Sequence, residues 1–292
     1  MAAQRRQWSR SGRVIGGLLS VLILSLILWI SLPGSAQAEN LPQEAAPTPL
    51  PGDAPPLTDV VSLASGAGSY WGVCGVTPEG EVYCWGSGTE LEPGQMQLVG
   101  VQQVVGGQMH FCALTQAGGV KCWGYNHNGQ LGFGIADNDS YDAVDVTGLQ
   151  SGVTALAAGE FHTCAVRAGE VWCWGDNHFG QLGDGTEEDR SQPVRVAGLP
   201  AGVTGIASLG NSTCAITSQG GVLCWGLNNY GELGNGSHSS SLQPIPVSGL
   251  SSGVIALAGG GYFICAITEQ GQVYCWGAND NGQLGDGTDS DR

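Results

Sequence analysis

The chain has 292 residues, of which 50 are glycine, and its formal net charge is −16. Such an acidic surface repels phosphate groups, which argues against binding to nucleic acid or to anionic lipid heads through a basic patch. It favours solubility and cationic partners or ions. The glycine content indicates either low complexity or a fold with many tight turns.

The first 38 residues have the features of an export signal. Four arginines precede an apolar run from Val14 to Leu32, and Ala36-Gln37-Ala38 is a small-residue cleavage pattern. The run approaches the length that spans a bilayer, so a retained N-terminal membrane anchor is the alternative to a cleaved signal peptide. Cleavage after Ala38 leaves five basic against 25 acidic residues, a net charge of −20. We expect an extracytoplasmic protein that is secreted, periplasmic or anchored facing outward.

The tripeptide Cys-Trp-Gly recurs along residues 59–292 and marks five units. Its tryptophans are Trp85, Trp123, Trp174, Trp225 and Trp276. They are spaced by 38, 51, 51 and 51 residues, so the first unit is shortened. A fixed period of this length indicates a repeat architecture in which each unit is one supersecondary element.

The third unit predicts four short strands. They are Val153–Ala158, Cys164–Arg167, Val171–Trp174 and Pro193–Val196. The proline in the last segment suits an edge strand, and no window has the apolar stripe of a substantial helix. The fold class is therefore all-β, a β-propeller of ~50-residue four-stranded blades with five units visible.

The repeat also resembles a known family. The segment HTCAVRAGEVWCWGDNHFGQLGDGT, with CALTQAGGVKCWGYNHNGQLGFG before it, is similar to the regulator-of-chromosome-condensation (RCC1-like) repeat family across roughly residues 58–292. The resemblance implies four-stranded blades around a central axis, usually about seven of them. It also implies guanine-nucleotide exchange on a nuclear GTPase as one family role, which export and strong acidity oppose here. Exported bacterial members of the family include enzyme inhibitors.

The two ends of the repeat region leave the number of blades open. The last residues, Asp286–Arg292, match Asp184–Arg190, and the outer strand that should follow is missing. The Pro- and Ala-rich segment 39–58 is either a linker or a closing strand, because Pro47–Gly52 could supply the missing strand and join the ends. The alternative is a fragment of a longer propeller.

Each unit contains two cysteines that are nine or ten residues apart. The pairs are Cys74 and Cys84, Cys112 and Cys122, Cys164 and Cys173, Cys214 and Cys224, and Cys265 and Cys275. Opposed residues on antiparallel strands come close enough for a disulfide, and export favours oxidation. We expect five disulfides within blades; the alternative is that cysteine serves as a small apolar core residue.

Candidate metal ligands do not form a convincing set. His110 and His162 occupy equivalent positions, but the other units have Gly72, Ser212 and Phe263 there, so we interpret the histidines as hydrogen-bonded blade residues. The loop Asn279–Gly282, followed by Asp286, superficially resembles a calcium-binding pattern but lacks the flanking helices and the ligand spacing. We expect no cofactor, with weak calcium binding as the alternative.

Residues that vary between repeats are the candidates for function, because the shared ones build the blades. These binding-loop candidates are Phe133, Tyr141, Glu187, Glu188, Asp189, His238, Tyr262 and Phe263. Nothing in the sequence marks catalytic residues, so we expect a monomeric binding scaffold for a protein or a cell-surface component rather than an enzyme. The alternatives are a secreted enzyme inhibitor and a carbohydrate-active or lyase-type propeller enzyme with a site on the central axis.

Overall fold

The computed structural model describes residues 57, 59–66, 72–86 and 94–292. All of them belong to one unit, Gly52–Arg292. The signal or anchor predicted over 1–38 and the closing strand predicted at Pro47–Gly52 lie outside the described residues. No helix in the described ranges is long and apolar enough to span a membrane.

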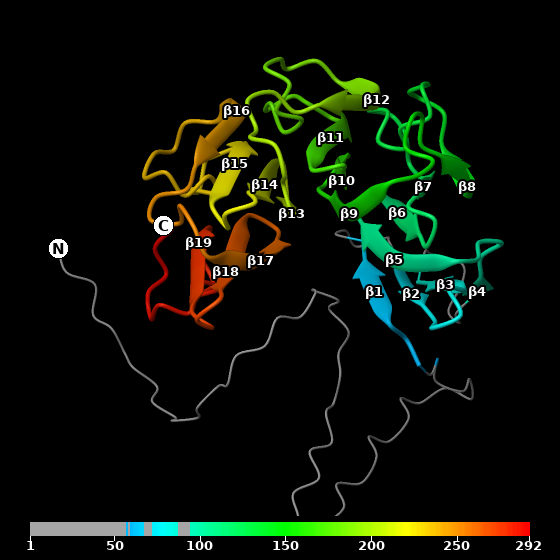
Figure 1. Ribbon diagram of the computed structural model, residues 1–292, viewed down its shortest axis with the longest axis horizontal. Coiled ribbons are helices and arrows are strands. Elements are labelled where there is room, and N and C mark those ends of the chain that lie inside the picture. The colour runs from blue at the N-terminus through cyan, green and yellow to red at the C-terminus, as the bar shows by residue number, and fades with distance from the viewer. Residues whose placement is uncertain (1–56, 58, 67–71, 87–93) are drawn as a thin grey trace, which may run out of the picture. The chain divides into compact units, whose positions relative to one another are not determined.

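The described strands form five antiparallel sheets that follow one another along the chain (Figure 1). The first contains β1 (Ser62–Ser65), β2 (Val73–Val76), β3 (Val82–Trp85) and β4 (Gly94–Gln95). The second contains β5 (Val101–Gly106), β6 (His110–Thr115), β7 (Val120–Gly124) and β8 (Ser140–Asp145). The third contains β9 (Val153–Ala158), β10 (His162–Arg167), β11 (Glu170–Gly175) and β12 (Arg190–Arg195). The fourth contains β13 (Gly205–Leu209), β14 (Ser212–Ile216), β15 (Val222–Gly226) and β16 (Ser241–Pro246), and the fifth contains β17 (Val254–Gly260), β18 (Phe263–Thr268) and β19 (Val273–Gly277).

This arrangement confirms the predicted all-β propeller blades. In the third sheet β9 has the predicted bounds, whereas β12 begins at Arg190, three residues before the predicted start. The fifth sheet has three strands. Arg292 exchanges two backbone hydrogen bonds with Gly277 of β19, and Arg190 pairs with Gly175 in the same way at the start of β12.

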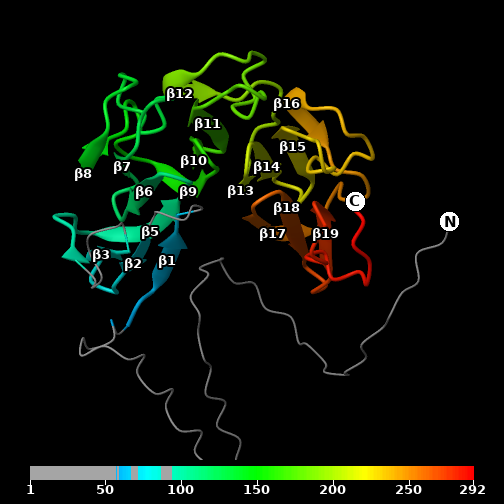
Figure 2. The same ribbon diagram turned by 180° about the vertical axis from the view of Figure 1, so that it is seen from behind.

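The innermost strands surround a central channel. Figures 1 and 2 show β1, β5, β9, β13 and β17 facing the middle of the arrangement. The channel has a volume of about 500 Å³ and is lined by residues of all five strands. Small side chains such as Ala157, Ala207 and Ala258 line it, and each of these strands approaches the next one along the chain closely.

The core lies between adjacent sheets. Four buried clusters are present in the described part of the chain, and each joins residues of two successive sheets. In one of them Val166 and Val171 of the third sheet pack with Ala215 and Trp225 of the fourth. Because each sheet buries its apolar face against its neighbour, a single sheet has no complete core of its own.

All ten cysteines form the five predicted disulfides within sheets. In each pair the two cysteines lie directly opposite each other on the two middle strands, as Cys164 does with Cys173. Their Cα atoms are 4.1 Å apart, which fits a non-hydrogen-bonded position of an antiparallel pair. The expectation of oxidised cysteines is confirmed.

Candidate functional site

The junctions between sheets position the loops of the candidate site. In three junctions the indole Nε1 of a tryptophan donates a hydrogen bond of 2.8–2.9 Å to a backbone carbonyl of the preceding blade. The pairs are Trp174 with Gln130, Trp225 with Gln181, and Trp276 with Glu232. The recurring tryptophans therefore connect neighbouring sheets, and the same contact fixes the backbone of the Gln or Glu residue beside it.

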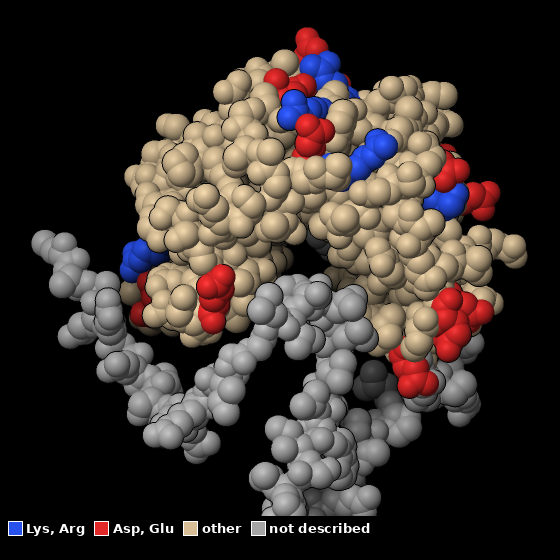
Figure 3. All heavy atoms as spheres, in the orientation of Figure 1, with Lys and Arg blue, Asp and Glu red and all other residues tan. Residues whose placement is uncertain are grey.

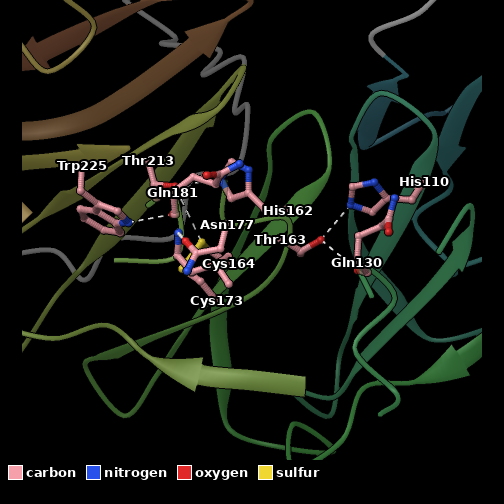
Figure 4. Close-up of a disulfide and its surroundings, with 11 residues drawn as sticks. His110, Gln130, His162, Thr163, Cys164, Cys173, Asn177, Gln181, Thr213 and Trp225 are labelled. Carbon is pink, nitrogen blue, oxygen red and sulfur yellow. Dashed lines mark hydrogen bonds between the residues drawn. A yellow bond between two sulfur atoms is a disulfide. The ribbon is translucent and has the colours of Figure 1, made fainter. Parts of the chain in front are cut away.

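Two buried histidines extend these junctions (Figure 4). Nε2 of His110 lies 2.8 Å from Oγ1 of Thr163, and Nε2 of His162 lies 2.8 Å from Oγ1 of Thr213. Each threonine hydroxyl donates onward to a Gln carbonyl, that of Gln130 or Gln181. Nε2 of each histidine must therefore carry the proton and donate it to the threonine. Burial lowers the pKa of both histidines to about 3, which fits their predicted role as neutral blade residues.

The turns that follow the innermost strands meet at one end of the channel. The backbone amide of Gln108 donates to the carbonyl of Glu160, and the amide of Glu160 donates to the carbonyl of Gly210, both at 2.8 Å. These bonds link the turns of the second, third and fourth sheets. The backbone of Glu160 is thereby bonded to the turns on both sides, and its side chain extends toward the fourth and fifth blades.

The Glu160 carboxylate reaches across two blades. Its Oε2 accepts a hydrogen bond of 3.0 Å from Nδ2 of Asn211 in the fourth blade, and its Oε1 accepts one of 2.9 Å from the hydroxyl of Tyr262 in the fifth. The Tyr262 ring lies against that of Tyr230, with ring centres 5.6 Å apart. Burial, followed by the bond to Glu160, raises the pKa of Tyr262 to about 12. Its phenol therefore stays protonated and donates to the carboxylate.

Glu232 adds a second carboxyl group next to Tyr262. It is fully buried; its Oε2 accepts from the backbone amide of Tyr230 at 2.8 Å, and its Oε1 has no hydrogen-bond partner. Gln130 and Gln181 occupy the equivalent positions of earlier blades. Desolvation by burial raises the pKa of the Glu232 carboxyl. We call Glu160, Asn211, Tyr230, Glu232 and Tyr262 the Glu160 cluster.

Of the predicted binding-loop residues, Tyr262 alone belongs to this cluster. Phe263 follows it at the start of β18 and is half-buried. Phe133 packs against the core between the second and third sheets. Tyr141 on the outer strand β8 is 75% exposed. It borders a groove of about 840 Å³ between the outer strands of the first two sheets.

The predicted acidic loop Glu187–Asp189 is held by bonds within its own blade and by one to the second blade. Oδ1 of Asp189 accepts from the backbone amide of Asn177, and Glu188 forms an ion pair with Arg190. Oδ2 of Asp189 accepts from Nδ2 of Asn128 at 3.2 Å. His238 is exposed and its Nδ1 donates to the carbonyl of Asn229. Figure 3 shows that many charged side chains on the face drawn there lie toward the periphery, several beside a residue of opposite charge.

Two side chains of the superficially calcium-like loop, those of Asn279 and Asp286, have protein partners for their oxygens. The side chain of Asn279 is buried and bonds to Leu284 and to carbonyls of the same loop. Asp286 accepts from Thr288 and pairs with Arg292 at 3.0 Å. Among the described residues no group of three His, Cys, Asp or Glu side chains is arranged to hold a metal ion. These contacts explain the Asn and Asp residues of the loop as turn-forming residues.

Sequence reasoning missed Glu160, Asn211, Tyr230 and Glu232. A signal for Glu232 was present, because it replaces a glutamine that recurs at Gln130, Gln181 and Gln283. Glu160 also varies between repeats, since the equivalent turn of the second unit has Gln108. The convergence of Glu160 with Tyr262, which are 102 residues apart in sequence, emerges only when the blades are placed around the channel.

Comparisons with known proteins agree with this architecture. Human E3 ubiquitin-protein ligase HERC2 is 36% identical over 236 residues, which cover 73% of this chain and 5% of HERC2. The ultraviolet-B receptor UVR8 of Arabidopsis thaliana is 30% identical over 233 residues, which cover 73% of this chain and 52% of UVR8. The chain therefore corresponds to a part of each of these relatives.

Solved structures share the fold. Human WBSCR16 superposes with a TM-score of 0.68 at 24% identity, covering 76% of this chain and 63% of WBSCR16. Prp20p from Saccharomyces cerevisiae gives a TM-score of 0.63 at 20% identity, covering 71% of this chain and 55% of Prp20p. The family model described as the RCC1-like domain matches residues 31–292. The match includes all five sheets, and the chain belongs to the RCC1-like domain family.

Proposed function

We propose that this protein is a binding scaffold for a protein partner in an oxidising, extracytoplasmic compartment. The proposal rests on one observation: the residues that recur among the repeats hold the blades together, whereas those that vary lie elsewhere. The recurring tryptophans, cysteines and asparagines are used inside blades and at their junctions. The residues that depart from the repeat, such as Glu160, Glu232 and Tyr262, gather at one end of the channel. Side chains that the fold does not need are the ones available for recognition.

The chemistry of the Glu160 cluster favours binding over catalysis. The Glu160 carboxylate is engaged by two neutral donors, Asn211 and Tyr262. The Tyr262 phenol, with its pKa raised to about 12, is a hydrogen-bond donor and a poor base. A rigid, partly buried polar group beside two aromatic rings is the type of anchor found at protein interfaces.

The five disulfides support the compartment in this proposal. Disulfides persist in secreted and periplasmic proteins and are rare where thiols are kept reduced. The strongly acidic surface fits a soluble domain that attracts basic partners. The export signal predicted at the N-terminus leads to the same compartment.

Affinity capture tests the proposal. The exported chain serves as bait against envelope and secreted fractions of the producing cells, and reduced, alkylated chain serves as the unfolded control. We expect a saturable partner that the folded bait retains and the unfolded bait loses. A Tyr262→Ser bait should retain at least tenfold less partner, whereas Tyr274→Ser, at an exposed position of β19, should behave as wild type. A folded bait that retains no specific partner contradicts the proposal.

A further inference from the structure

The Glu160 cluster carries negative charge that no lysine or arginine of the described chain balances. The described lysine and arginine side chains bond elsewhere, as the following pairs show. They are Lys121 with Asp145, Arg190 with Asp184, Arg195 with Glu170, Arg292 with Asp286, and Arg167 with the carbonyl of Gly148. The only groups bonded to the Glu160 carboxylate are the neutral ones of Asn211 and Tyr262.

The repeat places Glu232 beside Tyr262. Gln181 and Asn211 in the third and fourth blades correspond to Glu232 and Tyr262 in the fourth and fifth, 51 residues later in each case. In the earlier pair Nε2 of Gln181 donates to Oδ2 of Asp176 at 2.7 Å and lies 3.4 Å from Oδ1 of Asn211. Leu227 stands at the position of Asp176 in the fourth blade, and the charge of Glu232 helps to raise the pKa of Tyr262.

A buried carboxyl oxygen without a partner is costly. Oε1 of Glu232 is such an atom, in a side chain that is 0% exposed. Where blades two and three have a neutral amide, this blade has an acid. A cation that enters between Glu232 and Tyr262 would supply the missing donor and offset the charge.

We propose that the Glu160 cluster binds the guanidinium group of an arginine side chain from the partner protein. This inference rests on the proposed binding function and names its chemistry. Guanidinium presents several donors in one plane, enough for the free oxygen of Glu232 and the remaining lone pairs of Glu160. It also stacks on aromatic faces, and the rings of Tyr230 and Tyr262 lie 5.6 Å apart and tilted by 49°.

An organic cation fits this site better than a metal ion. Within the described residues no three acidic, histidine or cysteine side chains converge as ligands, and the cluster offers ring faces in addition to oxygens. Lysine would share the charge but has no planar face to stack on tyrosine. The arrangement therefore favours arginine over lysine.

Peptide titration of the exported chain tests the inference. The probe is acetyl-Gly-Arg-Gly-amide, its neutral counterpart has citrulline in place of arginine, and a third peptide has lysine. At low ionic strength we expect the arginine peptide to bind at least tenfold more tightly than the citrulline peptide in ligand-observed NMR. Lysine should fall between them. Because citrulline keeps the shape of arginine, the difference reports the charge.

Matched variants locate the site. Glu160→Gln and Glu232→Gln should each weaken binding of the arginine peptide at least tenfold, whereas Glu269→Gln, in an exposed turn, should leave it unchanged. Glu232→Gln restores the residue that the repeat has in other blades, so this variant is expected to fold. Equal affinity for arginine and citrulline, or wild-type binding by both cluster variants, overturns the inference.

The two proposals can fail separately. If the partner obtained by affinity capture is retained fully by the Glu160→Gln, Glu232→Gln double variant, the scaffold function stands and the arginine site is wrong. If the arginine peptide binds as expected but the folded bait retains no partner, the protein-scaffold function is wrong.

Discussion

The buried histidines show how a single residue makes this fold sensitive to pH. His110 and His162 are neutral in the folded chain, since burial lowers their pKa to about 3. In the unfolded chain a histidine titrates near pH ~6.5. Below that value the unfolded state takes up protons that the folded state does not, so stability is present above pH ~6.5 and is lost as the pH falls toward about 3.

We predict that His162→Gln flattens this pH dependence. Each buried histidine should contribute a slope of about 1.4 kcal/mol per pH unit below pH ~6. The variant should be less stable than wild type at pH 7, because the bond to Thr213 is altered, but the difference should shrink on acidification. Denaturant unfolding of the oxidised chain between pH 7 and pH 4.5 measures it. His238→Gln, at an exposed position, should keep the wild-type slope; parallel profiles for His162→Gln and wild type would refute the prediction.

The effect of Glu232 on stability should depend on pH in the opposite direction. Burial raises the pKa of its carboxyl, so the folded state is penalised as the pH rises through the unfolded value of ~4.3. We predict that Glu232→Gln stabilises the free protein at pH 7 by roughly 1 kcal/mol, since it replaces a buried carboxylate with a neutral amide. The gain should fade as the pH is lowered toward 4. Denaturation midpoints of the two chains at pH 7 and pH 4 test this, with Glu269→Gln as the control; a variant less stable than wild type at pH 7 would disprove it.

At the scale of the element, a glycine in each of the second, third and fourth blades accommodates the next blade's tryptophan. Gly183 has φ = +66°, and a Cβ atom there would lie 2.7 Å from Nε1 of Trp225. Gly198 has φ = +74° with open space around its Cβ position. The two glycines have the same backbone requirement and differ in their surroundings, which makes them a matched pair.

We predict that Gly183→Ala costs clearly more stability than Gly198→Ala. The control should lose about 1–2 kcal/mol from the left-handed backbone alone. Gly183→Ala should lose a further 1–3 kcal/mol, because the added methyl group displaces the tryptophan. Urea unfolding of both variants gives the difference. Equal losses of stability in the two variants would contradict the prediction, because they would show that the junction accommodates the added methyl group.

The strands of a blade were largely predictable because their pattern is local. Alternating apolar residues and turn glycines placed β9 with its observed bounds, and the opposed cysteines of β10 and β11 followed from hairpin spacing. The start of β12 was misplaced, since Arg190 pairs with Gly175 across an irregular register. That register shift has no signature in residue type.

The site was harder to predict because it is assembled between blades. Tyr262 was expected from its variation among repeats, but its bond to Glu160 links the third blade to the fifth. Glu232 matters through one unpaired oxygen, which depends on burial and not on sequence spacing. Contacts of this kind follow from the rotation between blades, and a single sequence does not give that rotation.

For the whole molecule, we expect the disulfides to decide whether the chain folds at all. Each closes a loop of nine or ten residues, and a loop of that size stabilises the folded state by about 3 kcal/mol in the chain-entropy account. Five such bonds together approach the entire stability of a typical domain, roughly 5–15 kcal/mol. Sites in separate blades should contribute additively, because they share no side-chain partners.

We predict that the fully reduced chain is unfolded at neutral pH, whereas loss of one bond is tolerated. Cys214→Ala with Cys224→Ala should lower the free energy of unfolding by roughly 2–4 kcal/mol and leave a cooperative transition. Reduction of all five bonds, followed by alkylation, should abolish that transition. Circular dichroism and tryptophan fluorescence measure both, and thiol titration of the native chain should find no free thiol before reduction. A reduced chain that unfolds cooperatively near the oxidised midpoint would mean that the packing of blades alone sustains the propeller, and it would remove the main physical reason for assigning the protein to an oxidising compartment.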